Sequence, residues 1–140
     1  MDKHLISDIH EYAERHPGLE FLDANAAELL RKEVGRRFAF PENHRWWWQT
    51  VPSAARIVSY AEGEGLKKLR AMVGAQTGHV CLFVTDDEDP PWPCVKGSIE
   101  DAITMVGEQR FFEYAIVDIN MTWIVFDTHM NTLVYVTQRG

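Results

Sequence analysis

Three consecutive tryptophans, Trp46 to Trp48, stand out among the residues whose types could build a functional site. They belong to the stretch HRWWWQT and directly follow Arg45. Successive side chains of a strand point to opposite faces, so a strand here places Trp46 and Trp48 on one face and Trp47 on the other. Exposed tryptophans beside an arginine are typical of hot spots in protein interfaces. The alternative is that the domain itself covers both faces, because large aromatic side chains also dominate cores.

A run of four carboxylates forms the second candidate feature, and Trp92 follows it after two prolines. Four neighbouring acids can attract a basic partner or hold a hard cation loosely. The run lacks the spacing and the glycine of a calcium-binding loop, and a solvated loop is the alternative interpretation. Combined with the tryptophan run, it predicts a partner-binding surface made of Trp46, Trp47, Asp86, Asp87, Glu88, Asp89 and Trp92.

A third group of residues could hold a small ligand. Asp127 and His129 lie at the predicted end of a strand and in the turn after it. Glu113 falls inside a predicted strand, where a carboxylate must be near an edge, paired, or part of a site. A tryptophan-lined pocket with polar groups from His44, Glu113, Asp127 and His129 is therefore the alternative site. Catalysis would also need a nucleophile or a metal, and Asp127 serves equally well as a turn former, so we predict no catalytic residue.

The usual motifs of cofactor-dependent and hydrolytic enzymes are missing from the sequence. It contains no GxGxxG, Walker loop, HExxH, GxSxG or CxxC. Its two cysteines, Cys81 and Cys94, are too few for a zinc site or a disulfide framework. We therefore expect no metal and no cofactor, and we favour a binding role over an enzymatic one.

The charge balance narrows the classes of partner. Twenty-one acidic and fourteen basic residues give a formal net charge of −7. This excess argues against nucleic-acid binding, which depends on Lys and Arg contacts to phosphate, and suits a basic protein partner. The first residues lack the apolar region of a secretory signal, and no apolar run reaches the roughly 18 residues of a membrane span. These features predict a cytoplasmic protein without membrane contact.

Helical periodicity appears four times along the chain. An amphipathic stripe over residues 2–15 predicts the first helix, which Pro17 and Gly18 end. The second helix should begin after Asp23 as N-cap and end at Gly35. A third is predicted over residues 66–73, and Ser98 with Asp101 resembles the capping box of a fourth.

The remaining apolar segments predict strands. They are the aromatic segment at 44–51, a second at 55–60, a buried central strand at 79–85, and three at 111–118, 121–127 and 132–137. Short turns join the last three, which favours an antiparallel meander. The 140 residues therefore predict a single α+β domain over 1–140, with two N-terminal helices, a mostly antiparallel sheet ending in a three-strand meander, and helices packed on one face.

The C-terminal stretch EYAIVDINMTWIVFDTH resembles the end of a group of small bacterial proteins. They share an E-Y-x-I-V strand, a turn, a W-[IL] strand and a turn that contains histidine. Some of these proteins are suspected immunity proteins of polymorphic toxins. The resemblance covers about 20–30 residues, much of it ordinary strand alternation. The pattern's turn often carries paired histidines, whereas this chain has Asp127, Thr128 and His129 there.

These observations lead to one expectation and two alternatives. The leading expectation is a small acidic protein-binding module, and the resemblance implies an immunity protein that occludes a basic toxin. Electrostatic attraction would speed the encounter and aromatic anchors would slow release. The first alternative is a small-ligand-binding protein or enzyme with the tryptophan-lined pocket. The second is a homodimer in which Trp47 lies in the contact between the two copies.

Overall fold

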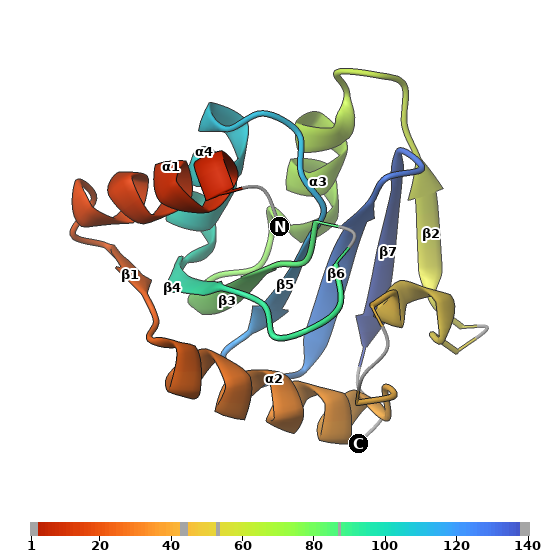
Figure 1. The fold of residues 1–140 in the computed structure, drawn as a ribbon. Helices are drawn as coiled ribbons and strands as arrows, with labels where there is room; N and C mark the ends of the chain where they lie inside the picture. The colour runs from red at the N-terminus through yellow and green to blue at the C-terminus, as the bar shows by residue number, and fades with distance from the viewer. Residues whose placement is uncertain (1–2, 43–44, 53, 87, 138–140) are drawn as a thin grey trace.

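The computed structural model describes residues 3–42, 45–52, 54–86 and 88–137. Along the chain, its elements are α1 (Lys3–Glu14), β1 (Leu19–Phe21), α2 (Ala24–Phe38), the 3-10 helix η1 (Trp47–Gln49), β2 (Arg56–Ser59), α3 (Gly65–Val73), β3 (His79–Val84), β4 (Cys94–Ser98), α4 (Ile99–Glu108), β5 (Tyr114–Asp118), β6 (Trp123–Thr128) and β7 (Thr132–Thr137). This is the predicted α+β class (Figure 1). Within the described ranges, no helix has both the length and the apolar composition that crossing a membrane requires.

One open antiparallel sheet organises the domain. In the described part of the chain its seven strands lie in the order β1-β4-β3-β5-β6-β7-β2. The predicted meander is confirmed, because β5 pairs with β6 and β6 with β7, each antiparallel. The predicted central strand is also present as β3, which lies between β4 and β5. The two short edge strands, β1 and β2, leave β5 at the middle of the sheet.

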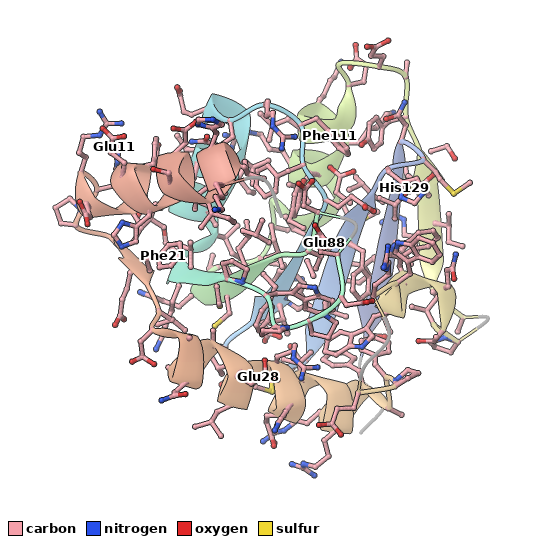
Figure 2. All side chains as sticks on the ribbon, viewed as in Figure 1. Glu11, Phe21, Glu28, Glu88, Phe111 and His129 are labelled. Atoms are coloured by element: carbon pink, nitrogen blue, oxygen red, sulfur yellow. The ribbon has the colours of Figure 1, made fainter. Side chains whose placement is uncertain are left out.

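Helices cover both faces of this sheet. The prediction of helices on one face holds for α1, α3 and α4, whereas α2 packs against the opposite face because the sheet is apolar on both sides (Figure 1). Glu11 on α1 and Glu28 on α2 mark these two layers in Figure 2. The chain changes face because edge strand β1 separates the two helices: α1 precedes β1 on one side, and α2 follows it on the other.

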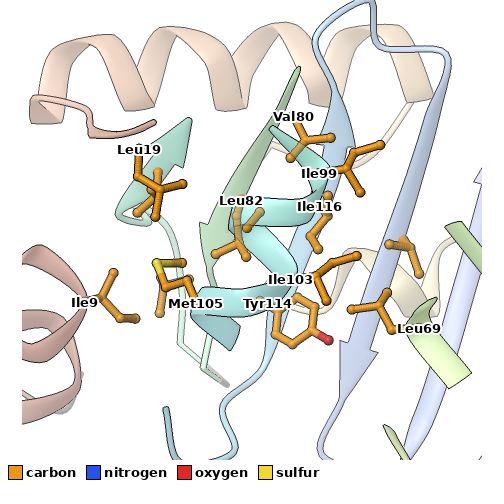
Figure 3. Close-up of a cluster of buried hydrophobic side chains, with 14 of the residues drawn as sticks. Ile9, Leu19, Leu69, Val80, Leu82, Ile99, Ile103, Met105, Tyr114 and Ile116 are labelled. Carbon is orange, nitrogen blue, oxygen red and sulfur yellow. The ribbon is translucent and has the colours of Figure 1, made fainter. Parts of the chain in front are cut away.

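The core therefore has two parts. The first lies under α1, α3 and α4; Figure 3 shows Ile103 and Met105 of α4 beside Leu82, Tyr114 and Ile116 of the sheet. The second lies under α2 and η1. It contains the side chains of the same strands that point away from the first core. Alternation along β3 to β7 thus fills both cores, as expected for strands that are apolar on both faces.

The second helix starts as predicted but ends later. The side chain of Asp23 accepts a hydrogen bond from the amide of Ala26 at 2.8 Å, which is the expected N-cap. Gly35 does not end the helix; α2 continues to Phe38, and Ala39 takes the left-handed conformation at φ 59°. A Cβ on Gly35 would lie 3.3 Å from the ring of Trp47, so this glycine serves the close approach of a core side chain.

The predicted strand over the tryptophan run is wrong. Trp47 to Gln49 form a single 3-10 turn, which Thr50 closes through hydrogen bonds from its amide and its hydroxyl to the Trp47 carbonyl. His44 lies outside the described residues. Trp46 and Trp48 are neighbours, with ring centroids 6.3 Å apart, and Trp47 points into the second core. The three side chains do not divide between two faces of a strand, because Trp48 also packs partly against that core.

Two strands were not predicted, and β5 and β6 begin later than expected. β1 has only three residues, and β4 follows the acidic loop directly, where short apolar content gives little periodic signal. The strand predicted from residue 111 begins at Tyr114. Its start is delayed because the Glu113 carbonyl accepts hydrogen bonds from the amides of Thr85 and Asp86, which already belong to the loop after β3.

Gly97 provides a test of how β1 packs on β4. A Cβ at this position would lie 2.6 Å from Cδ2 of Leu19 and 2.7 Å from the carbonyl oxygen of Gly18. We expect Gly97→Ala to lower the free energy of unfolding by about 1–3 kcal/mol, because the backbone of residue 18 must move. Urea unfolding measures the change. Glu20→Ala on the facing strand is the control, and equal stability of the two variants would contradict this packing.

Candidate functional site

The candidate residues meet at one end of the sheet, where β3 ends, β5 begins and β6 ends. Asp127 is the residue of β6 that pairs with Tyr114 at the start of β5. Tyr114 faces the core under α3 and α4, and its hydroxyl contacts Asp127, so Asp127 faces the same side. Glu113 and His129 each lie just outside these strands and contact one another. The side chains of Glu113 and Asp127 therefore lie on different faces of the sheet.

Glu113 is the buried carboxylate that orients His129. Only 4% of Glu113 is exposed, whereas His129 lies at the surface. Oε1 of Glu113 accepts a hydrogen bond from the backbone amide of His129 at 3.0 Å and lies 3.1 Å from its Nδ1. Two contacts to one carboxylate oxygen hold the imidazole in place. The expectation that Glu113 needs a partner is met by this pair.

Two tryptophans surround that imidazole. The ring centroids of Trp46 and Trp48 lie 6.0 Å and 5.8 Å from the His129 ring. The guanidinium carbon of Arg45 lies 5.6 Å from the centroid of the Trp46 ring, which is a cation–π contact. Nε of Arg45 also lies 3.1 Å from Oδ1 of Asp89. We call Arg45, Trp46, Trp48 and His129 the aromatic surface; Figure 2 labels His129 on this side of the molecule.

Trp47 and Trp92 lie beneath the aromatic surface and do not reach it. They are 1% and 2% exposed, and their ring centroids are 5.0 Å apart. Each indole donates a hydrogen bond to a backbone carbonyl, Trp47 to Pro41 at 2.7 Å and Trp92 to Glu88 at 2.8 Å. The partner-binding role expected of these two residues is corrected accordingly, because they anchor the two loops from inside. This burial also leaves no Trp47 surface for the homodimer contact.

The acidic loop is held by its own carboxylates. Oδ2 of Asp86 lies 3.5 Å from the Arg110 guanidinium, and its Oδ1 accepts from the Glu113 amide at 3.4 Å. Asp89 pairs with Arg45. Asp87 lies outside the described residues. Because arginines partner two of the acids, the loop is a less negative patch than four neighbouring carboxylates suggest.

Asp127 is buried between two tyrosines. It is 5% exposed, and its two oxygens accept hydrogen bonds from the hydroxyls of Tyr60 at 2.5 Å and Tyr114 at 2.9 Å. Burial raises the pKa of Asp127 from 3.8 to about 6. The charge of Glu113 adds to this rise, and the two phenol hydrogen bonds oppose it. Burial and the neighbouring carboxylate also raise the pKa of both tyrosines.

The structure therefore divides the residues that the sequence grouped. Glu113 and His129 join the aromatic surface, whereas Asp127 belongs to the opposite face with Tyr60 and Tyr114. The two tyrosines were missed, since neither stands in a motif and their partner is 67 and 13 residues away in the chain. Among the described residues, no group of three or more His, Cys, Asp or Glu side chains is placed to hold a metal ion.

Trp47 should carry much of the stability of this region. We expect Trp47→Ala to lower the free energy of unfolding by about 3–5 kcal/mol, because it removes a fully buried indole and its hydrogen bond to Pro41. Leu29→Ala is the control, since Leu29 is 72% exposed on α2. Urea unfolding measures both. A loss for Trp47→Ala no larger than for Leu29→Ala would contradict the anchoring role.

Asp127 should make stability depend on pH in a definite direction. Its raised pKa means that the folded state holds the proton more tightly than the unfolded chain, so the contribution of Asp127 to stability falls as pH rises from about 4 through about 6. The stability of wild type relative to Asp127→Asn should therefore fall by on the order of 2–3 kcal/mol between about pH 4 and pH 7. Urea unfolding at several pH values measures this. Asp8→Asn, at an exposed position of α1, is the control, and a pH-independent difference for Asp127→Asn would refute the assignment.

No model of a protein family matches this chain, and no curated protein or solved structure matches it either. Its function must therefore be argued from its own residues. Those residues form two separate arrangements: the aromatic surface around His129 and the buried carboxylate of Asp127 on the other face of the sheet.

Proposed function

We propose that this domain is a protein-binding module and that the aromatic surface is its contact site. The observation that carries the proposal is the grouping of Trp46 and Trp48 around His129 at the surface, with Arg45 stacked on Trp46. Tryptophan and arginine are the residue types that most often dominate binding energy in protein interfaces. They lie together here on one small area of the molecule.

The surface is also built to keep its shape. Trp47 fixes the turn from below, and Glu113 fixes the imidazole of His129 through two contacts. Side chains that are already ordered lose less entropy when a partner binds, which increases affinity without any additional contact. A core residue and a buried carboxylate thus support a surface whose two tryptophans are half-buried, so part of each ring is left for a partner.

Exposed apolar residues extend the contact area. Met130, which follows His129, is 64% exposed, and Ile57 on edge strand β2 is 63% exposed. Ile57 pairs with Val134, whose side chain belongs to the same core as Trp47, so Ile57 lies on this face of the sheet. An apolar centre with a polar rim is the usual organisation of a protein interface.

The partner that suits this surface is a basic protein. The formal net charge of −7 favours association with a positively charged partner and speeds the encounter at low salt. The specific form of the proposal is a cytoplasmic immunity protein that occludes a basic toxin. This form follows the resemblance of the C-terminal strands, and the aromatic surface would supply its anchors.

A small-ligand site on the same surface is the second candidate. The convergence of Glu113, His129, Trp46 and Trp48 favours it, because two indoles could hold a flat ligand beside an oriented imidazole. Asp127 faces the other side of the sheet and does not join them. Only some of the polar residues predicted for a ligand pocket are therefore present at this surface, so we rank the small-ligand site second.

The test compares capture by three versions of the immobilised domain from a lysate of the native cell. Trp46→Ser with Trp48→Ser should lose a protein that wild type captures, whereas Leu29→Ser should keep it, because Leu29 is an exposed residue of α2 that is not part of the aromatic surface. The purified partner should bind the double variant at least about 30-fold more weakly, consistent with the loss of one hot spot or more.

Two outcomes would refute the proposal. Equal binding of the partner to wild type and to the double tryptophan variant would remove the aromatic surface as the contact. An association rate that does not fall as salt is added would remove the electrostatic part, since attraction to a basic protein must be screened. Circular dichroism of each variant shows that the fold is kept.

A further inference from the structure

A pocket of about 510 Å³ opens on the opposite side of the sheet from the aromatic surface. Its lining residues come from the start of α3, the segment that leaves α4 and the adjoining ends of β5 and β6. Its volume falls in the range of small-molecule sites. Asp127 and Tyr114 line it from the sheet, and Tyr60 lines it from the segment before α3.

The walls of this pocket are aromatic. Tyr60, Phe111, Phe112 and Tyr114 all contribute to the lining. Phe111 is 51% exposed, and Figure 2 labels it near α3. Leaving a phenyl ring half in water is unfavourable, and an apolar ligand in the pocket would remove that cost.

Gly65 allows Tyr60 to approach the first turn of α3. A Cβ on Gly65 would lie 2.9 Å from two carbons of the Tyr60 ring, so a side chain there would displace the ring. In its observed place, the Tyr60 hydroxyl reaches Asp127 at 2.5 Å. The glycine thus helps to hold an aromatic wall and the carboxylate together.

The charges in the pocket favour a cation. In the described part of the chain the partners of the Asp127 carboxylate are two phenols, and no arginine or lysine forms a salt bridge with it. Glu62 adds a second carboxylate to the lining. Arg110 also lines the pocket, but its guanidinium is engaged by Asp86 and by the Phe111 carbonyl. A carboxylate has about four lone-pair positions, so Asp127 can still accept hydrogen bonds from a ligand.

We infer that this pocket binds a small organic ammonium ion with an apolar body, the ammonium group contacting Asp127 and the body lying against Phe111 and Tyr60. An ammonium group is attracted both to the carboxylate and to the faces of the aromatic rings. The apolar body takes the place of water against the exposed phenyl ring. The site is separate from the aromatic surface, so it stands whether or not a protein binds there.

The test uses benzylammonium and benzyl alcohol, which have the same shape and differ in charge. Each is titrated into isotopically labelled protein while the amide signals of Gly63, Gly65 and Gly107, which line the pocket, are followed by NMR. Benzylammonium should shift these signals saturably and bind at least about tenfold more tightly than the alcohol, because it alone gains the charged contact. Equal binding, or shifts confined to other residues, would overturn the inference.

Two variants with matched controls locate the contact. Asp127→Asn should abolish the preference for the cation, whereas Asp8→Asn, which changes the net charge equally on α1, should retain it. Phe111→Ala should weaken benzylammonium about fivefold through loss of the aromatic wall, and Leu29→Ala should not. If Asp127→Asn does not fold, Phe111→Ala decides the matter, because Phe111 is half-exposed. A preference that survives in folded Asp127→Asn, or unchanged affinity in Phe111→Ala, would overturn the assignment.

Discussion

The antiparallel pairing of β5 with β6 is the constraint on which the rest of the structure depends. It lies in the middle of the sheet and sets Tyr114 opposite Asp127. The same register brings Glu113, one residue before β5, beside His129, one residue after β6. A shift by one residue would send every side chain of one strand to the other face, so both sites depend on this single register.

Two cores protect that register. The core under α1, α3 and α4 contains Tyr114, and the core under α2 and η1 contains Phe126. In a strand that is apolar on both faces, a slip by one residue would exchange side chains between the two cores, and each core would then hold side chains of the wrong size. The packing of α2 against the second core is therefore essential, because without α2 the side chains of that core would be exposed to solvent.

Two buried carboxylates, Glu113 and Asp127, are unfavourable for the stability of the fold. Glu113 and Asp127 lie close enough for the charge of one to raise the pKa of the other, and both are almost fully buried. Each is stabilised by hydrogen bonds, from His129 in one case and from two tyrosines in the other. Proteins tolerate such groups chiefly at functional sites, where oriented and partly desolvated polar groups are useful. Both proposed binding sites are built on one of these acids.

The sequence by itself determined the α+β class, the first two helices, the central strand and the terminal meander, because these depend on local periodicity and capping. It also identified Glu113 as a carboxylate that needs a partner. It could not show that Trp47 is buried and Trp46 half-exposed, since a 3-10 turn between two prolines leaves no periodic pattern. It could not find Tyr60, whose contact with Asp127 spans 67 residues. Tertiary structure decided these points, because burial and hydrogen bonding between distant segments depend on the order of strands, which no local pattern contains.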